Sequence, residues 1–451
     1  MLAGGVVAGQ RALADETADA INELKQEIQA LDQKVRVLER QKEIDTEAAD
    51  AKARETPRIT VGNDGLSVNS ADSNFVFQLH GQVQVDSRTF FGDRNNNGQN
   101  IQGNDSFLLR RARPVFSGTL YKDFDFVFVP DFGGSSVQIF DAYLNYRYAP
   151  WLQLRAGKFK TPVGLEQLQA DQYILFNERA LPTDLMPNRD VGFQLGGDVA
   201  GGRLSYALGV FNGVGDGRNS GNADFEDHRE FAGRLFLQPF KTTGIAPLQK
   251  LGFGVAGSWG NTFSNASGLP GGFLTDGQQQ FFAYTNGVVA HGKHWRLSPQ
   301  GYYYYGPFGF MGEYVISDQK ISKGATSADL QNTAWQVAGS WVLTGEDASY
   351  TGVTPKRPFD PRVNQWGAWQ IAVRYAELDV SDNAFPTFAN PATSASGAEA
   401  FAVGLNWYLN RNIRVNGSFS RTTFDGNISR KQATVVRQPE NVIFTRVQLA
   451  F

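Results

Sequence analysis

Eight arginines stand at alternate positions of segments with a two-residue hydrophobic period, which places them on the polar face of predicted strands. They are Arg111, Arg113, Arg155, Arg234, Arg296, Arg374, Arg414 and Arg446. A guanidinium group is always charged, and its planar fork fits carboxylate and phosphate groups. A row of such groups along a narrow lumen would attract anions and let them move from one site to the next. The alternative is that these arginines pair with acids of nearby loops and stiffen the wall.

A second group of charged residues lies in a segment without a strand pattern, residues 162–188. Its 27 residues are more than a simple connection needs. The candidate constriction residues within it are Tyr173, Glu178, Arg179 and Asp184, and Arg189 follows directly after it. Acids and bases that face each other across a pore set its width and field, so the segment is predicted to be a constriction loop. The alternative is an external loop that only caps a trimer.

The elements that would position these residues are strands. In the last ten residues, 442–451, the odd-numbered side chains form an uncharged face that ends in the aromatic Phe451. Ten residues are about enough to cross a bilayer as a tilted strand. An apolar face with an aromatic at its end is typical of the closing strand of an outer-membrane barrel. A similar alternation recurs from Phe75 onward.

The chemistry of the two strand faces predicts their direction. The apolar faces are wide and almost free of charge, as in Phe401, Val403, Leu405 and Trp407. The opposite faces carry small residues and scattered arginines, which could not fill a core. An arginine that faced lipid at mid-bilayer would cost about 2–4 kcal/mol. The pattern therefore predicts apolar side chains outside and polar ones inside, around water.

The number of strands agrees with this interpretation. Seventeen candidates follow residue 70, and bacterial barrels have an even number of strands. Five connections are tight, at 121–123, 149–150, 201–202, 306–307 and 409–411. They fall on one side of the barrel only if the candidate strand at 279–290 belongs to a loop, and its removal leaves 16 strands. The long connections on the other side are then 89–105, 162–188, 214–227, 263–293, 380–396 and 426–436, and one long connection, 344–364, remains on the short-turn side. The predicted fold is all-β, a 16-stranded antiparallel transmembrane β-barrel.

The N-terminal segments differ from the rest of the chain. Residues 1–14 are read as the remnant of a signal peptide, because 2–9 are apolar and small and Ala12-Leu13-Ala14 is a cleavage pattern. A flexible tail is the alternative.

Residues 15–56 are predicted to be a helical coiled coil and linker, and 57–451 the barrel. The heptad seam consists of Ile21, Leu24, Ile28, Leu31, Val35 and Leu38. In isolation its β-branched a positions favour a parallel dimer, but the seam is short and should depend on an oligomer formed elsewhere. A single amphipathic helix lying on another surface is the alternative.

Composition argues against several other functions. The chain has four histidines, no cysteine and a formal net charge of -3, so nucleophile–base pairs are few and nucleic-acid binding is not expected. No run of 18 apolar residues exists, so no spanning helix is expected. Asp93–Gly98 fits half of a calcium loop, but its twelfth position is Asn104 rather than Glu. We expect no enzyme activity, no cofactor and no metal.

Four runs resemble the phosphate-selective porin family, the porins O and P, and the similarity covers roughly residues 60–451. They are Arg110–Arg113, Tyr121–Phe124, Gly157–Glu166 and Gly301–Gly309. The resemblance implies a trimeric outer-membrane barrel of 16 strands, with an arginine ladder, a constriction loop and a lysine cluster that pass anions. Some related porins carry a periplasmic coiled coil before the barrel. Where phosphate-binding members point a lysine into the lumen, this chain has Asp125 and Asp131.

Three functional hypotheses follow. The first is a passive, anion-preferring, homotrimeric porin for small phosphorylated or carboxylated solutes, located in the outer membrane with its coiled coil in the periplasm. The second is a structural barrel that tethers the envelope through contact of the coiled coil with peptidoglycan. The third is a general, weakly selective porin. The expected partners are outer-membrane lipid, small anions and further copies of the chain.

Overall fold

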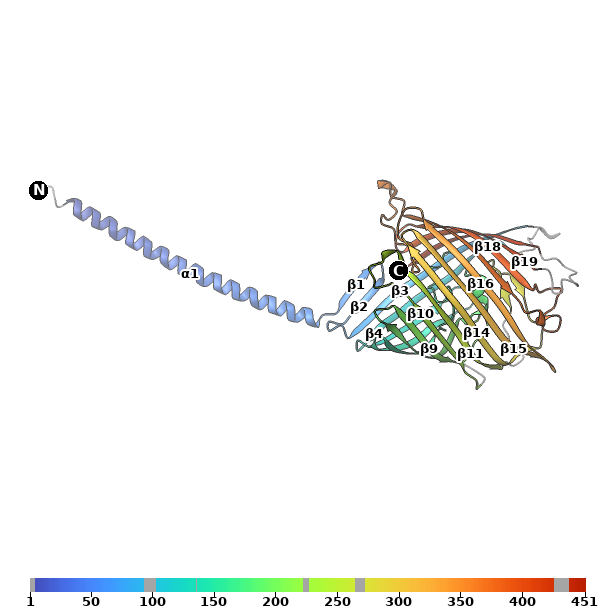
Figure 1. Ribbon diagram of the computed structural model, residues 1–451. Coiled ribbons are helices and arrows are strands. Elements are labelled where there is room, and N and C mark those ends of the chain that lie inside the picture. The colour runs from blue at the N-terminus through green and yellow to red at the C-terminus, as the bar shows by residue number, and fades with distance from the viewer. Residues whose placement is uncertain (1–4, 93–102, 135, 222–226, 264–271, 426–437) are drawn as a thin grey trace. The chain divides into compact units, whose positions relative to one another are not determined.

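The barrel is an antiparallel sheet that closes on itself (Figure 1). The computed structural model describes residues 5–92, 103–134, 136–221, 227–263, 272–425 and 438–451. Sixteen strands form the closed wall, because β20 (Glu440–Ala450) pairs antiparallel with β3 (Phe75–Phe91). The predicted barrel of 16 antiparallel strands is therefore confirmed.

The other strands of the wall follow in chain order, each paired antiparallel with the next. They are β4 (Ser106–Leu120), β5 (Phe124–Asp131), β6 (Gln138–Ala149), β7 (Leu152–Lys160), β8 (Arg189–Val199), β9 (Leu204–Phe211), β10 (Glu230–Leu237), β11 (Leu251–Phe263), β14 (Val288–Tyr305), β15 (Phe308–Lys323), β16 (Thr326–Val342), β17 (Ala368–Asp379), β18 (Gly397–Tyr408) and β19 (Ile413–Phe424). Outside the closed wall are β1 (Arg58–Gly62), β2 (Gly65–Asn69), β12 (Phe273–Leu274), β13 (Gln280–Phe282) and the short 3-10 helices η1 (Leu181–Leu185), η2 (Ala246–Leu248), η3 (Pro361–Val363) and η4 (Asp382–Ala384).

Side-chain direction in the wall agrees with the sequence pattern. Phe401, Val403 and Leu405 on β18 are 47%, 41% and 41% exposed, whereas Asn406 and Arg414 are 0% and 3% exposed. Apolar side chains on this part of the wall therefore face outward and polar ones inward. No helix in the described part of the chain is long and apolar enough to cross a membrane.

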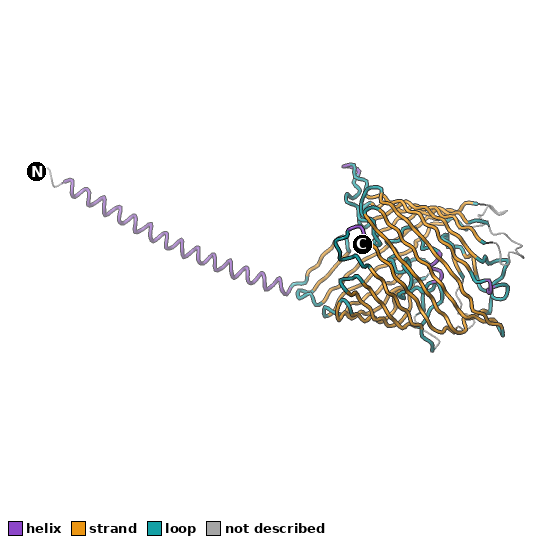
Figure 2. Tube along the Cα trace, in the orientation of Figure 1, coloured by secondary structure: helices purple, strands orange, loops and turns teal. Residues whose placement is uncertain are grey.

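The connections differ at the two ends of the wall (Figure 2). The five predicted tight connections all join neighbouring strands, from 121–123 between β4 and β5 to 409–411 between β18 and β19. The segment 279–290 lies mostly in the connection between β11 and β14, although its last three residues belong to β14. Residues 93–102, which include most of the calcium-like motif, lie outside the described residues.

The height of the wall varies around the barrel. Strands β5, β9 and β10 have 8 residues each, whereas β14, β15 and β16 have 18, 16 and 17. A tilted strand needs about 9–11 residues to span a bilayer. Strands β14–β16 are therefore long enough to span the bilayer without a covering subunit. Strands β5, β9 and β10 are not.

Part of the barrel interior departs from the predicted polar lining. Inward-facing Val315, Leu330 and Leu378 belong to an apolar cluster with Phe281 and Phe282 of the connection between β11 and β14. The predicted polar lining is interrupted here, because loops that fold into the lumen bring apolar side chains to the wall. Water is displaced from this part of the lumen, and burial of the apolar surface is favourable.

The N-terminal helix is described by itself. Helix α1 (Gly5–Glu55) is continuous for 51 residues and ends two residues before Pro57, as expected for a residue that cannot continue a helix. Its heptad side chains are 48–68% exposed in the single chain. Neither the coiled-coil assembly, nor the signal-peptide assignment, nor the division into 1–14, 15–56 and 57–451 is tested by these observations, and each stays a prediction.

Candidate pore and constriction

The connection between β7 and β8, residues 161–188, lies inside the barrel and is bonded to its wall. The backbone N–H of Leu165 donates to Glu313 Oε2 of β15 at 2.6 Å. Three strands further along the wall, on β18, the Asn406 amide donates to the carbonyl of Leu175 at 3.0 Å. The segment thus has the position expected of a constriction loop.

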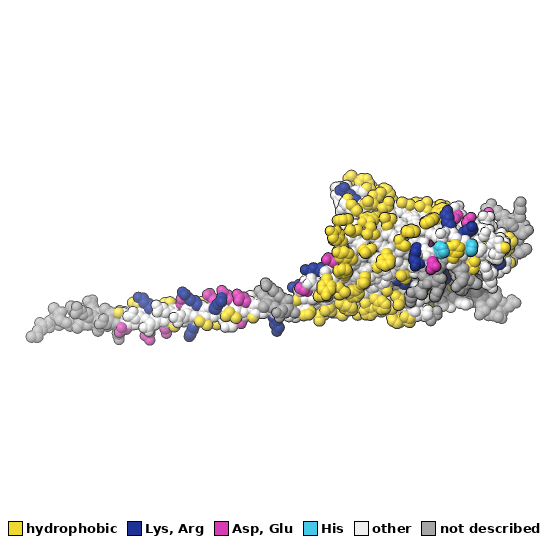
Figure 3. Space-filling model, turned by 90° about the horizontal axis from the view of Figure 1, so that it is seen from below, with side chains coloured by type: hydrophobic (Ala, Val, Ile, Leu, Met, Phe, Trp, Pro, Cys, Tyr) yellow, Lys and Arg dark blue, Asp and Glu magenta, His cyan; other side chains and the backbone are white. Residues whose placement is uncertain are grey.

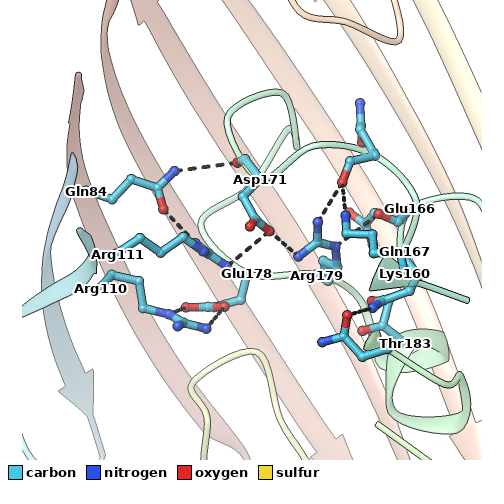
Figure 4. A network of polar contacts seen from close by, with 12 residues as sticks. Gln84, Arg110, Arg111, Lys160, Glu166, Gln167, Asp171, Glu178, Arg179 and Thr183 are labelled. Carbon is cyan, nitrogen blue, oxygen red and sulfur yellow. Dashed lines mark hydrogen bonds and ion pairs between the residues drawn. The ribbon is translucent and has the colours of Figure 1, made fainter. Parts of the chain in front are cut away.

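Glu178 of this loop is surrounded by arginines of the wall (Figure 4). Arg110 donates to both of its carboxylate oxygens, at 2.6 and 2.9 Å, and Arg88 donates at 3.0 Å. Arg446 lies 3.8 Å away. Burial alone would raise the pKa of Glu178, but the positive charges of Arg110, Arg111 and Arg446 lower it overall. The loop is therefore held by an ionised carboxylate at this point.

Asp171 forms a second ionic cluster at the same level. It pairs with Arg113 and Arg179, and its Oδ1 lies 3.5 Å from Arg111 Nη2. Burial opposes ionisation, but Arg111, Arg179 and Arg113 hold the pKa of Asp171 well below its usual value. Arg113 also pairs with Asp131 at 2.6 Å, the residue that stands where a lysine would be expected from the family resemblance.

A β-bulge explains why alternation missed Arg110. Gln84 on β3 pairs with Arg111, but the next residue, Val85, pairs with Leu109, so Arg110 is an extra residue in β4. Arg110 and Arg111 consequently both reach the interior, where Arg111 donates to Gln84 at 2.6 Å. Strict alternation from Arg111 and Arg113 places Arg110 on the lipid side. The bulge carries no local sequence signal that we recognise.

Three cations are not matched by carboxylates. Arg155, Arg234 and Lys160 have no carboxylate within 4.0 Å in the described part of the chain. Arg155 lies over the ring of Tyr143 at 4.6 Å, and its Nε has no hydrogen-bond partner. Two nitrogens of the Arg234 guanidinium donate to the same amide oxygen of Gln300, each at 3.1 Å. The Lys160 ammonium donates to a backbone carbonyl at 2.8 Å.

These three cations line one cavity of about 460 Å³ on the inner side of β4–β10, together with Arg113 and Arg189. The acids that line it are Asp141 and Asp171, and Asp141 is already paired with Arg189 at 3.1 Å. A smaller cavity of about 240 Å³ is lined by Arg110, Arg111, Arg179, Glu178 and Asp184. Arg113, Asp171 and Arg189 line both cavities, so these residues lie where the two meet.

Other predicted arginines are closed off by partners. Arg296 pairs with Asp216 at 2.7 Å and Glu230 at 2.9 Å and is fully buried. Arg374 pairs with Asp276 at 2.9 Å. Further paired or bonded members of the set are Arg446 with Asp86 at 2.6 Å and Arg414 with the carbonyl of Ile174 at 3.0 Å. For Arg296 and Arg374 the observed contacts match the alternative of pairing with loop acids, since Asp216 and Asp276 lie in connections. Arg446 pairs instead with an acid of the neighbouring strand β3, and Arg414 with a backbone carbonyl of the constriction loop.

Two predicted loop residues have other surroundings. Asp184 in η1 accepts a hydrogen bond from the backbone N–H of Leu274 at 2.9 Å, which joins the constriction loop to the β12 segment. Burial raises the pKa of Asp184 to about 8, with a further contribution from Asp276. Tyr173 packs near Gly352 of the connection between β16 and β17, where an added Cβ would lie 2.9 Å from its ring.

That connection also supports the constriction loop from the short-turn end. The Tyr350 hydroxyl donates to the carbonyl of Leu165 at 2.6 Å, and the Gln169 amide donates to the Tyr350 carbonyl at 2.6 Å. The ring of Tyr350 stacks on Tyr302 of β14 at 5.3 Å. The predicted long connection on this side, 344–364, therefore enters the lumen rather than extending away from it.

Comparison with known proteins identifies the barrel. Residues 77–451 match the family described as phosphate-selective porin O and P. The chain belongs to this family. It is 26% identical over 410 residues to porin O of Pseudomonas aeruginosa, which covers 80% of this chain and 86% of that protein. It is accordingly a porin of the bacterial outer membrane and a channel rather than an enzyme.

Solved structures share the fold of this porin. The outer-membrane channel DcaP of Acinetobacter baumannii aligns with a TM-score of 0.53 at 9% identity, over 84% of this chain and 98% of that one. An anion-selective porin from Comamonas acidovorans aligns with a TM-score of 0.51 at 12% identity, over 84% of this chain and all of that one. At these identities the similarity concerns the fold alone.

Proposed function

We propose that this porin passively conducts small anions, with phosphorylated or carboxylated solutes as the substrate class. The observation that carries the proposal is the cavity of about 460 Å³ lined by Arg155, Arg234 and Lys160, none of which has a carboxylate partner among the described residues. Guanidinium groups bind the planar oxygens of carboxylate and phosphate through two parallel hydrogen bonds. A wet cleft lined by one sign of charge also raises the local concentration of the opposite ion.

The ionic clusters at the constriction support a moderate preference rather than tight capture of phosphate. Asp171, Glu178, Asp86 and Asp131 neutralise many of the arginines there. Asp171 and Glu178 nevertheless each have three arginines within 4.0 Å, so positive charge remains in excess around them. Conduction requires binding that is favourable enough for entry and weak enough for exit. The description of the family as phosphate-selective agrees with an anionic solute.

Reversal potentials in a KCl gradient across a planar bilayer test the proposal. We expect chloride to be more permeant than potassium, and Arg155→Gln together with Arg234→Gln to reduce the permeability ratio. Each single variant, Arg155→Gln or Arg234→Gln, is compared with Arg421→Gln as the matched control. Arg421 is exposed on the outer wall of β19, and its substitution also removes one positive charge. Cation selectivity of the unmodified porin would refute the proposal.

Phosphate and small carboxylates added to the chloride current test the substrate class. We expect both to reduce the current at millimolar concentration, and less so in the Arg155→Gln, Arg234→Gln double variant. A current unaffected by either solute points to the general, weakly selective porin. Complete absence of conductance leaves the envelope-tethering barrel.

A homotrimer with a periplasmic coiled coil is part of the same proposal. Strands β5, β9 and β10 are too short to span a bilayer alone, which supports shielding of this sector by neighbouring copies. The exposed heptad of α1 supports assembly of the helices once the barrels have associated. Contact of this helix with peptidoglycan remains the specific expectation of the tethering hypothesis. Chemical crosslinking of whole cells, read as a ladder that ends at three chains, tests the assembly.

A further inference from the structure

The outer wall of the tall sector contains an apolar groove that the pore does not use. Its volume is about 630 Å³, and it runs across strands β11 and β14–β18. Hydrophobic side chains cover the barrel wall on the face seen in Figure 3. The walls of the groove include Phe253, Phe310 and Phe401, which are 46%, 55% and 47% exposed. The volume is within the range of pockets that hold small ligands.

Three glycines form the floor of the groove. Gly301 and Gly312 lie opposite each other on β14 and β15, and Gly339 on β16 lies opposite Phe310. At Gly339 an added Cβ would meet Phe310 and Val373 at 3.6 and 3.8 Å, which is ordinary van der Waals contact. A larger residue would therefore fit at position 339 without a clash. The groove is open at this point because glycine has no side chain to fill it.

The groove lies within the hydrocarbon part of the wall. An aromatic band consisting of Tyr305, Phe308 and Trp341 lies next to the short turn at 306–307 and marks the periplasmic interface. Phe308 and Trp341 stack there at 5.9 Å. The floor glycines follow a few residues further along the strands. The groove therefore opens toward the periplasmic leaflet, which consists of phospholipid.

The chemistry of the groove matches an acyl chain. The charged residue that lines it, Arg374, points to the interior, where it pairs with Asp276. Hydrocarbon can fill such a surface without leaving a polar group unpaired. The strands behind it are tall enough to face lipid without a covering subunit, in contrast to β5, β9 and β10. This difference in strand length separates the groove from the sector where neighbouring copies are expected.

We propose that this groove is a binding site for one acyl chain of a phospholipid of the periplasmic leaflet. The glycine floor lets the chain approach the strand backbone, and the flanking aromatic rings hold it from both sides by dispersion contacts. The site is separate from the pore, so its occupancy does not depend on which solute the porin conducts.

The test uses the full-length porin in vesicles of phosphatidylethanolamine and phosphatidylglycerol. A trace of phosphatidylethanolamine with a diazirine in its acyl chain is photoactivated, and the modified residues are mapped by mass spectrometry. We expect adducts to concentrate on the groove, and Gly339→Leu to reduce them at least about fivefold, equivalent to roughly 1 kcal/mol. Gly417→Leu is the matched control, because Gly417 is an outward glycine of β19 with nothing within 4 Å of an added Cβ. Unchanged conductance shows that both variants fold.

Two outcomes would overturn the proposal. One is an even distribution of adducts around the outer wall, unaffected by Gly339→Leu. The other is coverage of the groove by a second copy. The chain has no cysteine, so a photoreactive crosslinker attached to a single Gly339→Cys substitution reports on any neighbouring copy. Efficient crosslinking of two chains through that thiol, without crosslinking through Gly417→Cys, would assign the groove to a subunit contact.

Discussion

Arg446 on β20 and Asp86 on β3 form a bidentate ion pair across the seam at which the barrel closes. The distances are 2.6 Å from Nε to Oδ1 and 2.7 Å from Nη2 to Oδ2, and both side chains are completely buried. The two residues are also direct neighbours in the strand register. Residues that are 360 positions apart in the sequence thus join the last strand to the first.

Removal of one partner of this pair should destabilise the closed barrel. Arg446→Ala would leave the Asp86 carboxylate buried without a partner, a change that typically costs about 3–5 kcal/mol. We expect a lower urea midpoint for loss of the folded band on unheated gels. The double variant Arg446→Ala, Asp86→Ala should be less destabilised than Arg446→Ala. Equal midpoints for the single variant and the unmodified porin would contradict a role for the pair in closure.

Neutralisation of Glu178 should increase anion preference and loosen the loop. Glu178→Gln removes the negative charge that balances Arg88 and Arg110. We expect a higher chloride-to-potassium permeability ratio together with noisier single-channel current, because the loop loses its ionic attachment. Asp347→Asn is the control, since Asp347 is an exposed acid paired with Lys250 at 3.1 Å. An unchanged ratio in Glu178→Gln would show that the cluster does not face the ion path.

The raised pKa of Asp184, about 8, predicts a change of selectivity with pH. Below this pH the carboxyl is protonated and neutral, and above it a negative charge appears near Asp276, Asp216 and Arg218. Anion preference should therefore decrease as the pH rises from 7 to 9. Asp184→Asn should abolish this decrease while matching the unmodified porin at pH 7. A decrease of the same size in the variant would assign the titration to another group.

The same shift has a defined sign for stability. Because the pKa of Asp184 is raised in the folded state, the unfolded state binds fewer protons between about pH 4 and pH 8. The contribution of this group to stability should thus fall as the pH rises through that window. Asp184→Asn removes this contribution to the pH dependence, as measured by urea midpoints at pH 5 and pH 8.

The heptad of α1 should assemble without affecting conduction. Leu24→Ser with Leu31→Ser removes two d positions that are 57% and 59% exposed in the single chain. We expect loss of crosslinking between helices, with single-channel conductance unchanged. Gln26→Ser with Gln33→Ser changes the opposite side of the same two turns and should have no effect. Persistent crosslinking in the leucine variant would favour a helix that lies on some other surface.

Much of the barrel follows from local sequence, whereas the pore follows from contacts between distant segments. Outward-facing Phe401 and inward-facing Arg414 were predictable because each strand repeats its own period of two. Arg110 was not, since one extra residue in β4 shifts its direction relative to β3. The role of Asp171 also depends on how the loop folds, because its partners Arg111 and Arg113 come from β4. Alternation predicts which way a side chain points but not which loop it contacts.

The apolar cluster inside the barrel has a consequence for assembly. In an unclosed sheet Phe281 and Phe282 of the β11–β14 connection, and Val315 and Leu378 of the wall, would be in contact with water. Closure of the sheet and insertion of the loops therefore gain hydrophobic free energy together. This porin should acquire its narrow passage in the same cooperative step as its wall, so a half-built cylinder with a wide aqueous bore would not persist as a leak in the cell envelope.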